Sequence, residues 1–155
     1  IKPLDIHLMV FVPIIYISDL AKLEPKYITF HVEATKDIVK TIEEIRKQGI
    51  GVGLSIKPNT DLYELMPYLS LVDLVLLMSV EPGAGGQEFI SSSVERLKEL
   101  LEYRRQNNLS FQIEMDGGIN KDTIKQVADL DIVVSGSFVC KSDHYQERIN
   151  ELKNN

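Results

Sequence analysis

The sequence predicts an α/β fold in which parallel strands alternate with helices, and three observations support this fold class. Apolar runs typical of buried strands alternate with amphipathic segments about six times along the 155 residues. The connections are short and no linker-like stretch divides the sequence, so we expect a single domain over residues 1–155. The unusual polar and glycine residues fall at or just beyond the ends of the predicted strands.

The strand predictions rest on runs of apolar, β-branched and aromatic residues that are bounded by proline, glycine or polar turns. The run at 72–80 is nearly continuous in apolar residues, as expected of a parallel strand that is covered on both faces. We predict strands at residues 4–10, 27–32, 51–56, 72–80, 111–116 and 131–135.

Helices are predicted where apolar residues recur every three or four positions. The clearest case is residues 36–48, where three isoleucines share one face and Gly49 follows as a C-terminal glycine. Ser92 and Glu95 have the spacing of a capping box for a long helix that follows them. Further helices are predicted at residues 17–23, 62–69, 123–128 and 143–152.

Two architectures satisfy this alternation, an open doubly wound sheet and a (β/α)8 TIM barrel. We favour the barrel, because all strand ends converge on one face of a barrel but are spread out along an open sheet. A complete barrel typically has about 250 residues. We therefore expect about six βα units here, the C-terminal three-quarters of a barrel. The strand-end residues are His7, His31, the loop 83–86, Asp116 and Gly136.

Composition narrows the possible partners. The 17 basic and 23 acidic residues give a net charge of −6, which disfavours nucleic acid or an anionic membrane as a partner. No apolar run reaches the roughly 20 residues that span a bilayer. Cys140 is the single cysteine, which excludes an intrachain disulfide and fits a reducing cytoplasm. Because it lies beside Val139, we expect Cys140 to be a small buried hydrophobic residue.

The segment 111–120 is the strongest candidate for catalysis. Its predicted strand ends in Asp116, which is followed by Gly117 and Gly118, and Asn120 is a suitable N-cap for the next segment. A carboxylate at the carboxyl end of a strand, beside exposed backbone N–H groups, is where α/β proteins place catalytic groups. An ordinary turn is the alternative, because Asp-Gly is a common turn pair.

Three strand ends carry glycine, at 83–86, 117–118 and 136–137. Glycine allows the backbone to approach an anion closely, so the three together predict a phosphate site, although each alone could be a tight turn. Such a site would explain how an acidic protein holds a phosphorylated substrate. His7 lies in an apolar strand and is either a core histidine or, with Asp116, one of two ligands of a divalent metal.

These motifs together resemble the ribulose-phosphate 3-epimerase family. The resemblance covers essentially the whole sequence, beginning at the family's third barrel strand and thus lacking the first two βα units. It implies a barrel of the ribulose-phosphate-binding type and an isomerase of the pentose phosphate pathway that interconverts D-ribulose 5-phosphate and D-xylulose 5-phosphate at C3. The matching motifs are Leu4-Asp5-Ile6-His7-Leu8-Met9-Val10, Thr29-Phe30-His31-Val32-Glu33-Ala34, the segment 78–87, Glu114-Met115-Asp116-Gly117-Gly118-Ile119 and Gly136-Ser137.

The resemblance also implies roles for individual residues. His7 and Asp116 match metal ligands for Zn, Fe, Mn or Co, and Asp116 is also one of two acid/base aspartates. Met9 and Met78 match methionines that line the reacting carbons. A sugar phosphate is implied as the small-molecule substrate, and a homo-oligomer as the assembly. The phosphate contacts match Gly83, Ala84, Gly85, Gly86, Gly117, Gly118, Gly136 and Ser137.

The sequence departs from the family pattern in places. The family's other catalytic aspartate and two further metal ligands lie on its second strand, which has no counterpart here, so the resemblance gives this chain half of the catalytic pair and half of the metal site. Ala84 replaces a usual phenylalanine and Met115 a usual valine, which could loosen the loop or change the sugar preference. The alternatives are a 3-epimerase of another ketose phosphate, such as a hexulose 6-phosphate, and a non-catalytic phosphate-binding barrel or fragment.

Overall fold

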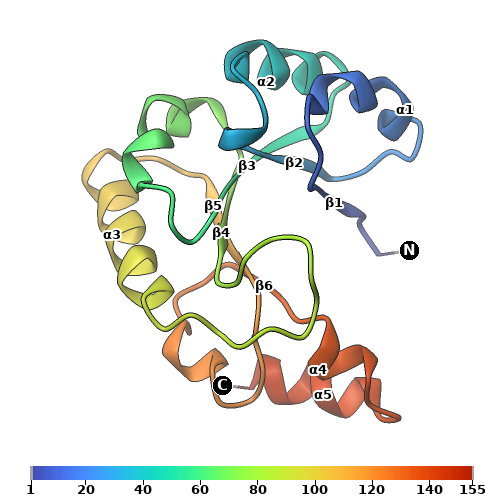
Figure 1. Ribbon diagram of the computed structural model, residues 1–155, viewed down its shortest axis with the longest axis vertical. Helices are drawn as coiled ribbons and strands as arrows, with labels where there is room; N and C mark the ends of the chain where they lie inside the picture. The colour runs from blue at the N-terminus through green and yellow to red at the C-terminus, as the bar shows by residue number, and fades with distance from the viewer. Residues whose placement is uncertain (1, 155) are drawn as a thin grey trace.

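The computed structural model describes residues 2–154, which form one curved sheet of six parallel strands with the helices arranged around its outer side (Figure 1). The strands are β1 Asp5–Leu8, β2 Tyr27–His31, β3 Gly51–Ile56, β4 Leu74–Met78, β5 Gln112–Asp116 and β6 Ile132–Val134. The α-helices are α1 Ile17–Ala21, α2 Ile38–Lys47, α3 Ser93–Gln106, α4 Ser137–Cys140 and α5 Tyr145–Lys153. Short 3-10 helices are η1 Pro13–Tyr16, η2 Val32–Ala34, η3 Leu62–Glu64, η4 Met66–Leu71 and η5 Ile124–Gln126.

The order of the strands distinguishes the two predicted architectures. The strands neighbour one another in sequence order from β1 to β6, whereas a doubly wound sheet reverses its order part-way. The sheet also curls strongly. Nδ1 of His7 on β1 lies 3.8 Å from Oδ2 of Asp116 on β5, although four flat strand spacings of about 4.8 Å would separate these strands by about 19 Å. The described residues therefore form a half-barrel.

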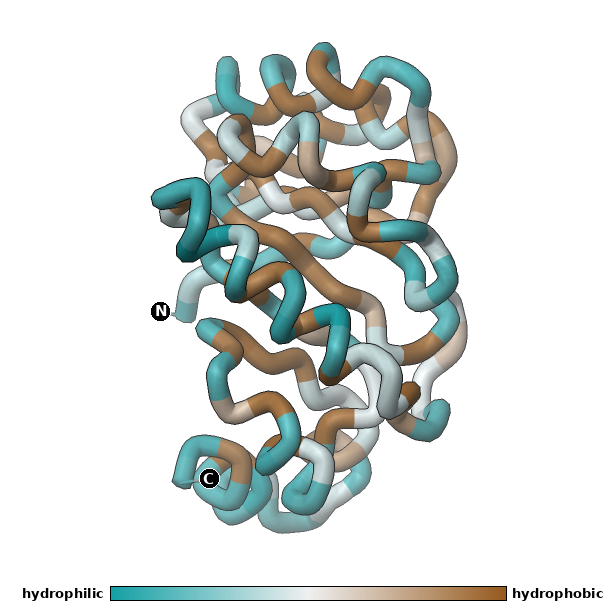
Figure 2. The backbone as a smooth tube through the Cα atoms, turned by 90° about the vertical axis from the view of Figure 1, so that its left-hand side faces the viewer, coloured by the Kyte–Doolittle hydropathy of each residue, from teal (hydrophilic) through white to brown (hydrophobic). Residues whose placement is uncertain are grey.

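The convex face of the sheet carries the main hydrophobic core. Alternate side chains of each strand, such as Ile28, Leu54 and Ile113, are fully buried there against the helices. Figure 2 shows these hydrophobic strands running through the molecule, with hydrophilic residues concentrated on the outer helices. The parallel sheet thus gains its stability from the burial of its outer face, as expected when crossover helices cover a sheet.

The concave face is polar on β1, β2 and β5, whereas β4 contributes Leu74, Leu76 and Met78 to it. The side chains between those of the core point inward, and several of them are buried although they are polar or ionisable. Tyr27 on β2 donates a hydrogen bond of 2.7 Å across this face to Oε1 of Gln112 on β5. The inward-facing polar residues are Asp5, His7, Tyr27, Thr29, His31, Ser55, Gln112, Glu114 and Asp116.

All six predicted strands are confirmed, but several local predictions are wrong. Residues 62–69 form η3 and η4 rather than an α-helix, since Pro67 near the start of η4 has no N–H to donate. The capping box is also wrong, because Ser92 has helical backbone angles and makes no side-chain cap, and Glu95 pairs with Lys98 instead. The prediction for 36–48 is confirmed by α2, with Gly49 at φ +74°.

The expectation for Cys140 is wrong as well. Cys140 is exposed, because it ends the short helix α4, none of whose residues is fully buried. The sequence pattern did not predict α4, and the helix predicted at 123–128 is reduced to the 3-10 turn η5. Within residues 2–154, no helix combines the length and the apolar character needed to cross a membrane.

Candidate active site

Asp116 is the last residue of β5, and its backbone is held in place by the end of β4. The Ser79 N–H donates to the Asp116 carbonyl at 2.8 Å. The Ser79 hydroxyl lies 3.0 Å from the same carbonyl and 2.7 Å from the Gly117 carbonyl. Ser79 is fully buried, so these bonds fix the direction in which the carboxylate leaves the strand.

The two glycines after Asp116 are required by the close approach of the loop that follows β4. Gly117 has φ +126°, and a Cβ there would lie 2.5 Å from Cγ2 of Val80. Gly118 has φ +64°, and a Cβ there would lie 2.5 Å from the backbone nitrogen of Phe89. Both positions therefore exclude a side chain for two reasons: the positive φ and the lack of space for a Cβ.

Asn120 caps the segment after the glycines, as the sequence predicts. Its Oδ1 accepts the N–H groups of Asp122 at 2.8 Å and Thr123 at 3.2 Å. The Thr123 hydroxyl in turn donates to the Gly118 carbonyl at 3.0 Å. The turn after β5 is thus fixed at both ends by side-chain hydrogen bonds, although only the 3-10 helix η5 follows it.

The loop 83–86, the glycine loop, is closed by a residue for which the sequence suggested no role. Nε2 of Gln87 donates to the carbonyls of Glu81 at 2.6 Å and Ala84 at 2.8 Å. Nδ2 of Asn59, from the loop after β3, donates to Oε1 of Glu81 at 3.1 Å. Gln87 is the one long amide side chain in this segment, which is the signal that could have identified it as a loop-closing residue.

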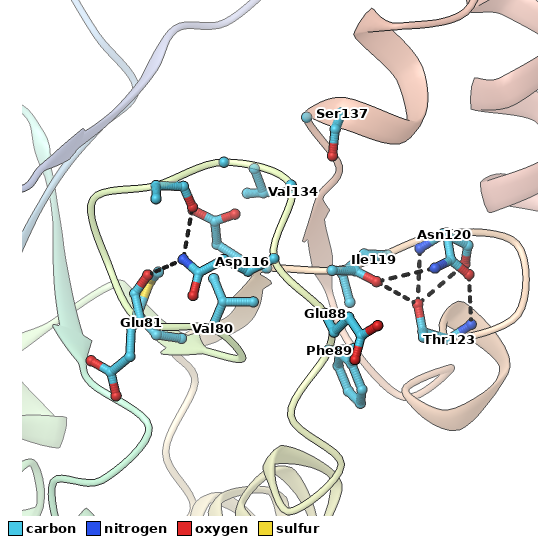
Figure 3. A pocket seen from close by; sticks show the side chains of 18 of the residues that line it. Val80, Glu81, Glu88, Phe89, Asp116, Ile119, Asn120, Thr123, Val134 and Ser137 are labelled. Carbon is cyan, nitrogen blue, oxygen red and sulfur yellow. Dashed lines mark hydrogen bonds between the residues drawn. The ribbon is translucent and has the colours of Figure 1, made fainter.

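A cavity of about 880 Å³ opens at the carboxyl ends of β4, β5 and β6. Its size is within the range of small-molecule sites. Figure 3 shows side chains from separate elements around it, among them Glu81 after β4, Asp116 at the end of β5 and Ser137 at the start of α4. Every residue predicted to contact substrate lines this cavity except His7, namely Met9, Met78, Gly83, Ala84, Gly85, Gly86, Gly117, Gly118, Gly136 and Ser137.

The ionisable residues that line this cavity are all acidic. Glu81, Glu88 and Asp116 contribute carboxylates, and no lysine or arginine is among the lining residues. A cation lies just outside, because Nζ of Lys141 is 3.8 Å from the place that a Cβ on Gly86 would take. No sequence pattern predicts this approach, since it depends on how the end of α4 lies beside the glycine loop.

His7 lies behind Asp116 and belongs to a row of four polar side chains. Its Nδ1 is 3.8 Å from Oδ2 of Asp116, and its Nε2 is 2.8 Å from Nε2 of His31. Nδ1 of His31 lies 3.3 Å from Oε2 of Glu33. Burial alone would raise the pKa of Glu33, but hydrogen bonds from His31, Thr60 and the Lys57 N–H outweigh it and lower that pKa to about 2. Glu33 is therefore a carboxylate at neutral pH.

Glu114 has the opposite electrostatic character. It points into the half-barrel one inward position before Asp116 and is 4% exposed. Burial, together with the nearby carboxylates of Asp5 and Asp116, raises the pKa of Glu114 to about 8. Glu33 and Glu114 thus hold opposite protonation states near pH 7.

His7 and Asp116 are close enough together to be two of the ligands of one divalent metal ion. Metal–ligand bonds to imidazole nitrogen and carboxylate oxygen are about 2.1 Å long, so two ligands of one ion can lie 3.8 Å apart. Within residues 2–154, no three His, Cys, Asp or Glu side chains gather as a metal site. The pair therefore offers two of the ligands that a divalent ion needs.

Comparison with known proteins identifies the family. Residues 1–140 match the model of the ribulose-phosphate 3 epimerase family. The chain belongs to this family. It is 39% identical over 137 residues to the ribulose-phosphate 3-epimerase of Treponema pallidum (strain Nichols), covering 87% of this chain and 63% of the relative. It is 38% identical over 153 residues to the ribulose-phosphate 3-epimerase of Aquifex aeolicus (strain VF5), covering 97% of this chain and 69% of the relative. The chain thus spans about two thirds of the length of these relatives.

Solved structures support the fold alone. The chain resembles KGPDC from Streptococcus mutans, with a TM-score of 0.74 at 13% identity, covering 99% of this chain and 71% of that one. It also resembles a mutant tryptophan synthase α-subunit from the hyperthermophile Pyrococcus furiosus, with a TM-score of 0.71 at 16% identity, covering 99% and 67%. These likenesses agree with the barrel-like curvature of the sheet.

Proposed function

We propose that the protein is a metal-assisted 3-epimerase that interconverts D-ribulose 5-phosphate and D-xylulose 5-phosphate. The observation that carries this proposal is the position of Asp116, at the wall of the cavity, beside His7 and between the glycine-bearing strand ends. Family membership supports the same activity. Strand order and curvature further support a complete (β/α)8 barrel as the architecture in which it works.

The glycine-bearing loops are the proposed phosphate site. Residues 83–86, 117–118 and 136–137 line one cavity. At Gly117 and Gly118 the backbone lines this cavity without a side chain. Backbone N–H groups bind phosphate without adding positive side chains. This arrangement would place the sugar between the loops and the Asp116 carboxylate.

Inversion of a carbon requires a base on one face and an acid on the other. We assign one of these roles to Asp116, which would take or return the proton at C3. A divalent ion held by His7 and Asp116 would supply positive charge next to the substrate oxygens. Met9 and Met78 line the cavity and would exclude water from the reacting carbons. The family's second aspartate, the partner of Asp116, has no counterpart among residues 2–154.

The test is the exchange of the C3 proton of ribulose 5-phosphate with deuterium from solvent, followed by NMR. Asp116→Asn is expected to slow this exchange by about 10²- to 10⁴-fold, because the amide cannot act as a base. Asp122→Asn is a matched control, since Asp122 is exposed and its side chain does not line the cavity. Near-normal exchange by Asp116→Asn would contradict the role of this residue.

The same assay separates the alternatives. A faster exchange with a hexulose 6-phosphate than with ribulose 5-phosphate would identify the protein as an epimerase of the longer sugar. Phosphate binding without exchange of either sugar would indicate a non-catalytic barrel. Sedimentation or light scattering tests the homo-oligomer that the family resemblance implies.

A further inference from the structure

The row formed by Glu33, His31, His7 and Asp116 crosses the concave face from the segment after β2 to the end of β5, and its four side chains are spaced by 3.3, 2.8 and 3.8 Å. The two histidine rings lie nearly stacked, with centroids 4.9 Å apart and an interplanar angle of 28°. His31 is 4% exposed, so water cannot easily replace its partners. The protonation pattern of this row decides which atom of His7, with or without a hydrogen, faces Asp116.

The contact between the two histidines allows only one hydrogen. At 2.8 Å, one Nε2 must carry a hydrogen and the other must accept it with its lone pair. A neutral imidazole carries its single hydrogen on either Nδ1 or Nε2. The two rings are therefore coupled, because the tautomer of His31 dictates the opposite tautomer of His7.

Glu33 determines which of the two arrangements forms. Oε1 of Glu33 already accepts the Lys57 N–H at 3.0 Å and the Thr60 hydroxyl at 2.5 Å. Its other oxygen, Oε2, lies 3.3 Å from Nδ1 of His31, a buried nitrogen that makes no hydrogen bond of regular geometry. A carboxylate only accepts hydrogen bonds, so it favours the hydrogen of His31 on Nδ1. Nε2 of His31 is then bare, and the hydrogen between the rings belongs to His7.

The distance from His7 to Asp116 agrees with this assignment. With its hydrogen on Nε2, His7 turns a bare Nδ1 toward Oδ2 of Asp116. The 3.8 Å separation is too long for an Nδ1–H that donates to this carboxylate, which would lie at about 2.8 Å. Two electron-rich atoms that face each other at this distance are suited to share a cation.

We propose that Glu33 and His31 are positioning residues that fix the tautomer of His7, so that its bare Nδ1 and the Asp116 carboxylate face a divalent cation together. The part of this proposal that concerns the cation rests on the proposed function, whereas the tautomer does not. A metal ligand must offer a lone pair, and the hydrogen bond on its second nitrogen sets which nitrogen that is.

Helix α3 supports this arrangement from outside the sheet. Nη1 of Arg96 donates to the Thr60 carbonyl at 2.7 Å, and Nη2 lies 3.3 Å from the Lys57 carbonyl. These are the two residues whose N–H and hydroxyl hold Oε1 of Glu33. The loop after β3 is therefore fixed on one side by Arg96 and orients Glu33 on the other.

This geometry makes Glu33→Gln an unusually sharp test. The Lys57 N–H and the Thr60 hydroxyl are both donors, so they would hold the amide oxygen in place of Oε1. The amide NH₂ would then face His31 and donate to its Nδ1, which reverses the tautomers of both rings. Thr60→Val is the matched control, because it removes one donor but leaves a carboxylate facing His31.

The experiment is ¹⁵N NMR of the two rings in the metal-free protein at a pH of about 8, above the reference histidine pKa. We expect an Nε2–H tautomer for His7 and an Nδ1–H tautomer for His31 in the unaltered protein and in Thr60→Val, and the reverse in Glu33→Gln. In a titration with Zn²⁺ alone, Glu33→Gln is expected to lose about 10- to 100-fold in affinity, and Thr60→Val to change little.

An Nδ1–H tautomer of His7 in the unaltered protein would overturn the proposal, and this measurement does not depend on whether any variant folds. An unchanged His7 tautomer in folded Glu33→Gln would overturn the assignment to Glu33. The tautomers also separate this proposal from the proposed function. If the tautomers and Zn²⁺ affinities are as expected but the protein does not exchange the C3 proton, only the proposed epimerase activity is contradicted. If the protein is an active epimerase but His7 carries its hydrogen on Nδ1, only the positioning role of Glu33 and His31 is contradicted.

Discussion

Glu114→Gln is expected to remove most of the pH dependence of the folding stability of the metal-free protein between about pH 4.5 and pH 8. Glu114 lies in the middle of β5, and burial next to the carboxylates of Asp5 and Asp116 raises its pKa from 4.5 to about 8. Over this range the folded protein keeps a proton on Glu114 that the unfolded chain has released. Folding is therefore linked to proton binding at this residue.

The sign and the size of the effect follow from these two pKa values. The stability contributed by protonated Glu114 is fully present below pH 4.5 and is lost as the pH rises through about 8. At about 1.4 kcal/mol per pH unit, the loss in the free energy of unfolding is at most about 5 kcal/mol. Glutamine stays neutral, so the variant should match the unaltered protein at about pH 4 and exceed its stability above about pH 8.

Urea unfolding across this pH range measures the difference. A chelator is needed, because a cation at Asp116 would offset the repulsion that helps to raise the pKa of Glu114. A smaller slope of the same sign should remain, since burial also raises the pKa of Asp5. Glu95→Gln is the control, because the Glu95 side chain is 75% exposed. Equal stability differences at both ends of the range would refute the buried, protonated Glu114.

Two further predictions concern the loops around the cavity. Lys141→Met should raise the KM for the sugar phosphate about fivefold, corresponding to about 1 kcal/mol, and leave turnover of the unphosphorylated sugar unchanged, because the ammonium group lies beside Gly86. An equal effect on both sugars would contradict a phosphate contact. Gly118→Ala should destabilise the fold by more than about 2 kcal/mol in urea unfolding, because its Cβ would meet the backbone of Phe89. Gly83→Ala is the control, because Gly83 also has a positive φ and a Cβ there would meet nothing within 4 Å, so a larger loss in this control would contradict the steric argument.

The strands could be predicted because the strands of a buried parallel sheet are runs of apolar residues in the sequence. The apolar run at 72–80 is an example, although only Leu74–Met78 pair as a strand. Val72 and Val80 are buried although they do not belong to β4. The predicted strand was therefore too long at both ends, because hydrophobic residues beyond the strand are buried as well. Helix type was less predictable, since the apolar spacing over residues 62–69 suits either kind of helix, and Pro67 was the one local signal against an α-helix.

The cavity could be predicted in outline for a similar reason. Asp116 and the glycine-bearing loops stand out because they interrupt apolar strands, and the topology brings strand ends together. The row from Glu33 to His7 could not be predicted in the same way. It depends on distances between residues 24 positions apart, and on the two donors that hold Glu33, neither of which leaves a periodic signal.

Two glycines of β3, Gly51 and Gly53, leave room for side chains of β2 on the concave face. A Cβ on Gly53 would collide with the side chain of Thr29, and one on Gly51 would lie 2.5 Å from the Tyr27 ring. The Tyr27 and Thr29 side chains of β2 therefore lean over β3, and Tyr27 reaches Gln112 on β5. Interiors of small barrels alternate large and small residues in this way to accommodate their taper. The sequence pattern presents these glycines as ordinary members of a strand, yet they leave the space that Thr29 and the Tyr27 ring occupy.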